Sequence, residues 1–431
     1  MICLPEETRV AILGGVRTPL AKAGTTLRKV HVTDLARAAM QETLYRVGLK
    51  PDVLDEVLLG NVVMPADAAN PARVAALWAG VPDRVPAMTV QRNCASGMEA
   101  VSQAAGLVRS GEAKAVLAGG AESMSGTPLL FPQFAAEPLV ALARAKGLIR
   151  KAAAATHLRP SHFAPIASLE CGLTDPTNGQ IMGKTAETLA KEWGISREEQ
   201  DGFALESNQK AVAAADKLGE EIVPVYAGDK YDAVTTDNGP RPGQTMEALG
   251  KLRPIFDKRD GTVTVGNSCQ VTDGAATLLV GDAAWARSEG IEPLGYVSAY
   301  AVAGLDPARM GLGPVYAIDR LLRKTSVQLS DIDLFEINEA FAAQVLACLK
   351  AMESDSFARQ HLDRDHALGA IDRSKLNVNG GAVALGHPVG ATGARIVLTL
   401  LMEMKRRGAK LGLAALCVGG GQGAAMLLER R

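Results

Sequence analysis

Apolar residues follow two alternating patterns along the first part of the chain. Residues 10–13 and 55–60 are short apolar runs of the kind found in buried strands. Residues 34–47 carry apolar positions at helical spacing and end at Gly48, a common residue after a helix. This alternation predicts a mainly parallel sheet that is covered by helices.

The pattern then occurs a second time. In each half, a polar turn leads into an apolar strand that ends at an asparagine, at Asn61 and at Asn338, 277 residues apart. In each half a helix is predicted further on, over residues 94–109 and 390–407. We infer two related halves, residues 1–290 and 291–431, that face one another.

Glycine-ended strands follow both helices and complete the repeat. They end at Gly119-Gly120 and at Gly419-Gly420, 300 residues apart. The extra 23 residues of this second spacing match a charged insertion at about residues 353–375.

Between residues 126 and 254 the alternation is interrupted. Strong helices are predicted over residues 183–193 and 196–218, and the second opens with Ser196 followed by Glu199, the pattern of a capping box. We interpret residues 127–255 as an inserted helical lobe that closes over the active face of the sheet.

Composition excludes several classes of protein. Apolar residues make up 47% and charged residues 22%, which is typical of soluble globular proteins. The net charge is −1 and aromatic residues make up 4%, so the chain lacks both the charge and the stacking residues that nucleic-acid binding needs. The 44 glycines are concentrated in clusters, where we expect the functional residues.

The cysteines and histidines do not form a metal site by spacing. The six cysteines include no CxxC pair, and the histidines pair at best five residues apart, which turns the second ring away on a helix. The chain begins without a basic and then apolar segment, so we expect no signal peptide. We expect a cytoplasmic protein with free thiols, no metal and no transmembrane segment.

Cys94 is a candidate nucleophile. It precedes Ala95-Ser96-Gly97 at the start of a helix, where the helix dipole and unpaired N–H groups favour a thiolate. The small neighbours leave room for a substrate. The alternative is a small buried apolar residue without chemistry.

His387 occupies the corresponding place in the second half. It lies in a Gly/Pro loop just before the second-half helix, and no lysine follows the glycines, which excludes a phosphate-binding P-loop. The repeat would bring His387 and Cys94 together across a pseudo-twofold axis. The alternative is an exposed histidine that takes no part in the chemistry.

Cys417 precedes Gly419-Gly420-Gly421 at the end of an apolar strand. Only eight residues follow Gly423, too few for the helix of a dinucleotide site, so we exclude NAD. The glycines can instead point backbone N–H groups at a ligand oxygen beside a second thiol. Asn338 is either a helix cap or part of a site in which one thiol is acylated and the other moves a proton.

Four blocks of the sequence together resemble the signature motifs of the thiolases, in order and over essentially the whole length. They are Asn93-Cys94-Ala95-Ser96-Gly97, Asn338-Glu339-Ala340-Phe341, Gly386-His387-Pro388 and Cys417-Val418-Gly419-Gly420-Gly421. The resemblance implies a five-layered α-β-α-β-α fold of two similar halves with an inserted lobe. It also implies an acyltransferase that cleaves 3-ketoacyl-CoA with CoA, or runs the reverse condensation, through an acyl-cysteine.

The resemblance implies a role for each site residue. Cys94 would be the nucleophile, His387 would take its proton, and Cys417 would be the second acid/base. One oxyanion hole would consist of His387 and a water held by Asn338, and the other of the N–H groups of Cys94 and Gly419.

The resemblance also concerns substrates and partners. Met182 and Phe341 would line the pantetheine tunnel, and Cys269 stands where the family often has a serine near the thioester sulfur. Acyl-CoA and CoA would be substrates, with no further cofactor. The inserted lobe resembles the thiolase component of fatty-acid β-oxidation complexes, although those proteins commonly carry histidine in place of Asn338. A homodimer or homotetramer is expected, with a hydratase/dehydrogenase subunit as a possible partner.

Residues 127–165 are basic and partly apolar. They carry five bases and one acid: Arg144, Lys146, Arg150, Lys151 and Arg159 against Glu137. This segment is a solvated helix face, an attractor of CoA phosphates, or a docking surface for a partner enzyme or a membrane. The resemblance favours docking.

Two other functions were weighed. Decarboxylating condensing enzymes of the same fold need no second catalytic thiol, so Cys417 argues against them. A lipid-binding protein without catalysis would have no chemical need for Cys94, His387, Asn338 and Cys417 together.

Overall fold

The computed structural model describes residues 9–431, and its main strands form two sheet segments of matching topology, which the antiparallel pairing of β1 with β11 joins into one ten-stranded sheet. In the first half the order is β1-β10-β5-β3-β4, with β1 and β5 antiparallel to β10 and with β5, β3 and β4 parallel. In the second half β11-β14-β13-β12 repeats these pairings. The strands are β1 (Val10–Arg17), β3 (Glu56–Gly60), β4 (Ala87–Val90), β5 (Ala115–Glu122), β10 (Thr272–Asp282), β11 (Gly295–Gly304), β12 (Leu334–Ile337), β13 (Leu411–Val418) and β14 (Gln422–Glu429).

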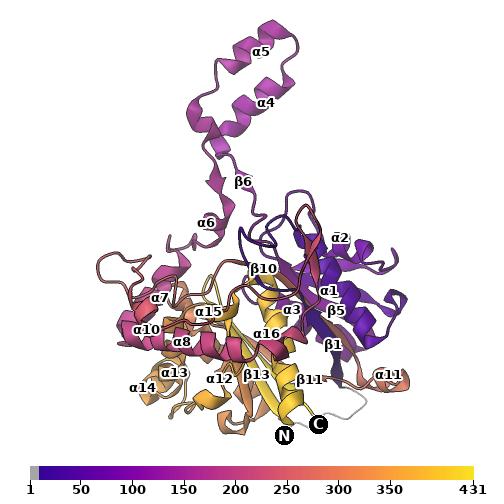
Figure 1. Ribbon diagram of the computed structural model, residues 1–431, viewed down its shortest axis with the longest axis vertical. Helices are drawn as coiled ribbons and strands as arrows, with labels where there is room; N and C mark the ends of the chain where they lie inside the picture. The colour runs from indigo at the N-terminus through magenta and orange to yellow at the C-terminus, as the bar shows by residue number, and fades with distance from the viewer. Residues whose placement is uncertain (1–8) are drawn as a thin grey trace.

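Helices form three further layers around these sheets (Figure 1). The central layer is α3 (Ser96–Ser110) and α16 (Val389–Arg407), and α16 packs on strands of both halves. α1 (Val32–Val47) and α2 (Pro71–Trp78) cover the first sheet, while α12 (Gly313–Thr325) with α13 (Ala342–Met352) covers the second. The predicted fold class is confirmed.

The strand register corrects the alignment of the two halves. Gly60 pairs with Gly120 in the first half, and Ile337 pairs with Ala415 in the second. The equivalent positions of β5 and β13 are therefore 295 residues apart, and the spacing of 300 that was inferred from the glycines is wrong. By this register, Glu122 in the first half occupies the position equivalent to Cys417 in the second half.

Aligning the glycine pairs gave the wrong spacing because the glycines have different structural roles in the two halves. Gly119 and Gly120 lie inside β5, where a Cβ atom would collide with the backbone of Ala276 or Gly390. Gly420 and Gly421 form the turn from β13 into β14 and have φ of +84° and +77°, which side chains other than glycine rarely tolerate.

Most of the inserted segment packs on the body. α7 (Met182–Glu192), α8 (Arg197–Ala213) and α10 (Met246–Gly250) lie here, and the capping box of Ser196 and Glu199 is present. The helix predicted over residues 196–218 is broken at Ala214. Shorter elements are β2 (Ala21–Lys22), β8 (Val225–Ala227), β9 (Asp232–Val234), α6 (Ser168–Gly172), α9 (Ala215–Gly219), α11 (Ala283–Ser288), α14 (Asp355–His361) and α15 (Ala382–Leu385).

Residues 129–167, called the arm below, project from the body (Figure 1). β6 (Leu129–Leu130) pairs with β7 (Ile166–Ala167) as a stalk, and α4 (Ala136–Arg144) with α5 (Leu148–Ala155) forms a hairpin at its outer end. No residue of α4 or α5 is buried. The expectation that the inserted lobe closes over the sheet is therefore wrong for the arm, whose apolar side chains Leu148 and Ile149 stay exposed and do not pack on the body.

Across residues 9–431, none of the helices combines the length and the apolar character that crossing a lipid bilayer requires.

Candidate active site

Cys94 lies in a tight turn between β4 and α3, two residues before the first residue of the helix. Asn93 has φ of +42°, and Ser96 closes the turn. The Ser96 hydroxyl accepts a hydrogen bond from the backbone N–H of Arg92 at 2.8 Å and donates to the carbonyl of Asn93 at 2.6 Å. These bonds hold the thiol at the end of α3 that faces the second half.

The environment of Cys94 does not favour a thiolate in the free enzyme. Burial raises the pKa of the Cys94 thiol to about 11, although the backbone N–H groups of Gly419 and of Cys94 itself act in the opposite direction. The expectation of a lowered pKa is therefore wrong, because loss of hydration outweighs the N–H groups. Cys94 needs a base to become a nucleophile.

His387 is the candidate for that base. It lies two residues before α16, as Cys94 does before α3, and it is 6% exposed, which excludes the exposed alternative. Its Nδ1 is 2.6 Å from the Thr392 hydroxyl, which itself donates to the carbonyl of Pro388 at 2.9 Å. Because this hydroxyl has one proton, Nδ1 of a neutral ring must be the donor. The lone pair then lies on Nε2, which makes no hydrogen bond within residues 9–431.

The surroundings of His387 keep it neutral. Burial, together with the nearby guanidinium of Arg395, lowers the pKa of His387 to about 3. Arg395 belongs to the interior face of α16 and is 3.4 Å from the carboxylate of Glu336. His387 is therefore an unprotonated base at neutral pH.

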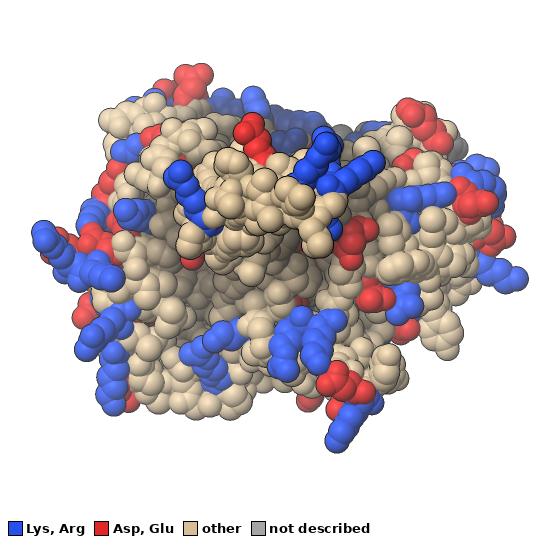
Figure 2. All heavy atoms as spheres, turned by 90° about the horizontal axis from the view of Figure 1, so that it is seen from above, with Lys and Arg blue, Asp and Glu red and all other residues tan. Residues whose placement is uncertain are grey.

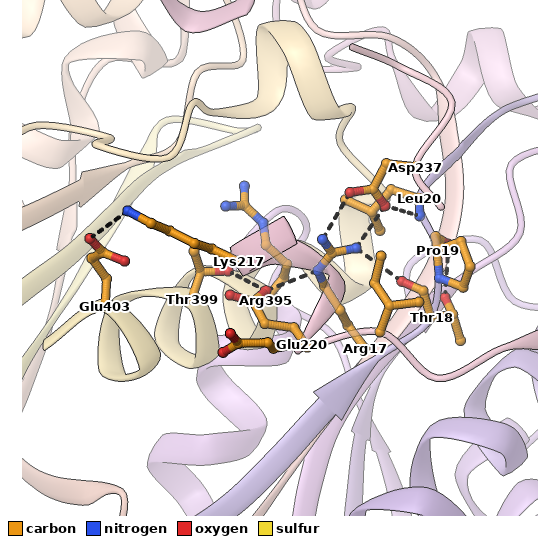
Figure 3. A network of polar contacts seen from close by, with 12 residues as sticks. Arg17, Thr18, Pro19, Leu20, Lys217, Glu220, Asp237, Arg395, Thr399 and Glu403 are labelled. Atoms are coloured by element: carbon orange, nitrogen blue, oxygen red, sulfur yellow. Dashed lines mark hydrogen bonds and ion pairs between the residues drawn. The ribbon is translucent and has the colours of Figure 1, made fainter. Parts of the chain in front are cut away.

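A buried ionic network anchors the helix that carries Arg395 (Figure 3). Arg17 donates to Glu221 at 3.0 Å and forms two hydrogen bonds with Asp237, at 2.7 and 2.8 Å. Thr399 of α16 donates to the same Glu221 at 3.0 Å. Strand β1, the segment around residues 221–237 and α16 are thus held together.

Asn338 follows β12 and is 1% exposed. Neither side-chain atom of its amide has a hydrogen-bond partner within the described chain, and Phe341 is the residue that precedes α13. Asn338 is therefore not a helix cap. A buried amide with both groups free can hold a ligand or a water at the site.

Cys417 is the next-to-last residue of β13 and is also 1% exposed. Burial holds the pKa of its thiol well above the usual range, and the neighbouring thiols of Cys94, Cys348 and Cys269 raise it further. The structure thus brings Cys94, Cys269 and Cys417 into one neighbourhood.

A cavity of about 410 Å³ leads to this neighbourhood. Its wall includes His387 and the three residues that were predicted to contact substrate, Met182, Phe341 and Cys269. Cys94, Cys417, Asn338 and Gly419 are not part of this wall. Gly419 lies next to the wall, because a Cβ on it would be 3.3 Å from the sulfur of Met182, and the thiols of Cys94 and Cys417 neighbour Cys269 of the wall.

Two buried glutamates support the site and were not predicted. Glu122 accepts from the backbone N–H of Gly390 at the start of α16 at 2.9 Å. Glu339 accepts from Ser207 at 2.7 Å and from Asn377 at 2.8 Å. Glu339 belongs to the block that begins at Asn338, and Glu122 is the last residue of β5. A glutamate in a sequence gives no sign of which distant N–H groups it binds.

The partly buried thiol of Cys94, the buried neutral imidazole of His387 and the unbonded amide of Asn338 are the groups of a candidate cysteine acyltransferase site. Comparison with known proteins identifies the family. Residues 10–284 match the thiolase N-terminal domain and residues 291–430 match the thiolase C-terminal domain. The chain belongs to the thiolase family and is an acyltransferase that acts by thiolytic cleavage or condensation.

Individual relatives agree with this assignment. The chain is 43% identical to an acetyl-CoA acetyltransferase of Cupriavidus necator (98% of this chain, 100% of the relative) and 40% identical to a 3-ketoacyl-CoA thiolase of Yersinia enterocolitica (98% and 97%). Among solved structures, the Bacillus anthracis acetyl-CoA acetyltransferase has a TM-score of 0.86 at 40% identity (98% of each chain). Human mitochondrial 3-ketoacyl-CoA thiolase in complex with CoA has a TM-score of 0.85 at 36% identity (99% of each chain).

Proposed function

We propose that this enzyme cleaves 3-ketoacyl-CoA with CoA, and condenses two acyl-CoA molecules in reverse, through an acyl group on Cys94. The observation that carries the proposal is that His387 is a neutral base with a free lone pair on Nε2, while backbone N–H groups of Gly419 and Cys94 act on the Cys94 thiol. Thiol and thioester chemistry with a thiol acid/base needs no further cofactor or metal. Since this chemistry depends on free thiols, we place the enzyme in the reducing cytoplasm.

In the first half-reaction, Nε2 of His387 takes the proton of the Cys94 thiol. The thiolate attacks the ketone carbon C3, and the N–H groups of Cys94 and Gly419 stabilise the resulting oxyanion. The C2–C3 bond breaks, the acyl group stays on Cys94, and Cys417 protonates the carbanion of the departing acetyl-CoA. His387 and a water held by Asn338 stabilise the enolate oxygen of that carbanion.

In the second half-reaction the Cys417 thiolate takes the proton of an incoming CoA thiol. The CoA thiolate attacks the acyl-Cys94 thioester, acyl-CoA leaves, and the Cys94 thiolate recovers its proton from His387. Each of the two acid/base groups ends in the state in which it began.

The cavity fits the narrow arm of CoA. Met182 and Phe341 provide apolar walls for pantetheine, and Phe256 packs edge-on against Phe341 at a ring distance of 6.0 Å. Lys22 and Arg241 line the same cavity and supply positive charge for the phosphates of CoA.

We also propose a homodimer through strand β4. Among the described residues β4 pairs with β3 alone, so no strand pairs with its outer edge, where Asn70 Nδ2 donates to the carbonyl of Ala87. Met88 of this strand and Trp78 at the end of α2 are 46% and 54% exposed. A second copy that pairs along this edge would satisfy the backbone and cover both side chains.

For the arm we propose docking to the hydratase/dehydrogenase subunit of a β-oxidation complex. Its outer end exposes Leu148 and Ile149, 89% and 87% accessible, next to Lys146, Arg150 and Lys151. Figure 2 looks down on this side of the molecule, where Lys and Arg side chains border uncharged surface. An acidic partner surface with an apolar centre would complement this arrangement.

The direct test combines kinetics with mass spectrometry. Incubation with acetoacetyl-CoA and CoA should yield acetyl-CoA, and quenched samples should carry an acetyl group on the peptide that contains Cys94. Cys94→Ala should abolish both while the far-UV circular dichroism stays unchanged. An acetyl label on Cys269 or Cys348 would contradict the assignment.

A further inference from the structure

The turn that presents Cys94 contains a residue with two unusual features. Asn93 is one of five residues other than glycine with positive φ among residues 9–431. Asparagine tolerates this left-handed conformation better than most residues, whereas bulky residues adopt it at a cost. A residue there turns the chain sharply just before the thiol.

The side chain of Asn93 also spans the two halves. Its Nδ2 donates a hydrogen bond of 2.8 Å to the carbonyl oxygen of Gly419, 326 residues away. Gly419 follows β13 directly and precedes Gly420 and Gly421, both with positive φ. This turn consists of glycines and therefore has little stiffness of its own.

The other contacts of Gly419 explain why its position matters. Its backbone N–H bonds to the sulfur of Cys94, and its α-carbon packs beside Met182. If the turn moved by a few tenths of an ångström, the N–H of Gly419 would no longer be aligned with the N–H of Cys94. Catalytic donors need such alignment before the reaction begins.

We propose that Asn93 is a positioning residue that joins the nucleophile turn to the Gly419 turn, with its backbone aiming Cys94 and its amide holding Gly419 in line. The inference deepens the proposed function, on which it rests. It adds to that mechanism a residue that touches neither the substrate nor the reacting atoms.

Two variants separate the backbone role from the side-chain role. Asn93→Gly keeps the left-handed turn and loses the hydrogen bond. Asn93→Asp keeps the shape but replaces the donor with a carboxylate, which repels the Gly419 carbonyl. We expect kcat for acetoacetyl-CoA thiolysis to fall about tenfold in Asn93→Gly and about a hundredfold in Asn93→Asp. The second loss is as large as that usually caused by removing one oxyanion donor. KM should change less than threefold, because Asn93 does not touch the substrate.

A second measurement does not depend on turnover. The rate at which iodoacetamide alkylates Cys94 at pH 8 should fall at least threefold in Asn93→Gly and further in Asn93→Asp, because the Gly419 N–H no longer supports the thiolate. The control is Ser326→Gly, which alters another left-handed position (φ +56°) at the end of α12. It should match the wild type in both assays.

The outcomes are distinct. Wild-type kcat and alkylation rates in both Asn93 variants would overturn the inference. A wild-type enzyme without thiolysis would refute the proposed function, and alkylation alone would then decide the role of Asn93. A rise in KM with unchanged kcat would also contradict it, since it would show that Asn93 acts in substrate binding.

Discussion

In the proposed mechanism Cys94 gives its proton to His387, and the surroundings of the two groups leave both neutral in the free enzyme. Burial raises the pKa of the thiol to about 11 and lowers that of the imidazole to about 3. An ion pair is therefore unfavourable in the free enzyme. Substrate must assist, because the N–H groups that face the sulfur and the substrate oxygen stabilise negative charge only once it develops.

This state of the pair predicts the pH dependence of alkylation. Because the thiol pKa is raised, the thiolate fraction below pH 11 is small and increases about tenfold per pH unit. Alkylation of Cys94 by iodoacetamide should therefore rise continuously from pH 6 to pH 9. A plateau below pH 8 would show a stable thiolate–imidazolium pair and would contradict this assignment.

Cys417 is predicted to act in proton transfer alone. Cys417→Ser keeps the shape but raises the pKa of the acid/base group, so thiolysis should fall by about two orders of magnitude or more. Acylation of Cys94 by a simple acyl-CoA should survive, because that step forms no carbanion. Rapid-quench mass spectrometry of the two half-reactions checks this, and an equal loss in both would contradict the division of roles.

At this scale the sequence predicted the residues better than their state. Motif blocks singled out Cys94, His387 and Cys417 as candidates, and their roles stay predictions. The pKa of Cys94 depends on how fully distant segments enclose it, which local sequence does not encode. The partners of Thr392 and Glu122 were missed for the same reason.

Helices α3 and α16 are the elements that bring the two reacting groups together. They cross closely, since a Cβ on Gly97 would lie 2.8 Å from the backbone N of Ala394, and one on Gly393 would collide with the backbone of Met98. The predicted extents of both helices agree with the structure to within two residues at each end. The register of β5 and β13 was predicted wrongly, because a glycine pattern does not distinguish a crowded strand from a turn.

Gly393→Ala tests the crossing. The added methyl group has no room beside the backbone of Met98, so unfolding free energy should fall by about 1–3 kcal/mol, the usual cost of overpacking. Gly106→Ala on α3 is the matched control, since a Cβ there meets no atom within 4 Å. It should stabilise the protein by about 0.5–1 kcal/mol, the usual helical difference between the two residues. Urea denaturation measures both, and equal effects of the two substitutions would contradict the crossing.

For the whole molecule, the docking proposed for the arm would separate catalysis from attachment to a partner. The sequence showed that the arm is basic but not that it projects from the body. A segment that binds another molecule has the same pattern of basic and apolar residues as a segment that packs on its own protein. Neutralising Arg144, Lys146, Arg150 and Lys151 to glutamine should change thiolysis of acetoacetyl-CoA by less than twofold. Co-purification of the hydratase/dehydrogenase subunit should weaken, and the effect should shrink at high salt.

Other results would redirect this interpretation. Loss of binding to vesicles containing anionic lipid, with partner binding unchanged, would assign the arm to a membrane surface. A collapse of affinity for free CoA would assign the basic residues to the nucleotide site. Either result would refute docking to the partner enzyme.

The contact between the two halves also determines when activity appears during folding. Cys94 and His387 are 293 residues apart, and the Asn93–Gly419 hydrogen bond closes a loop of similar length. Each sheet can form from its own half, but the reaction site exists only after the two halves have docked. In refolding from urea, circular dichroism should therefore recover first and thiolysis last. Recovery of turnover therefore measures the last step of folding, the docking of the two halves.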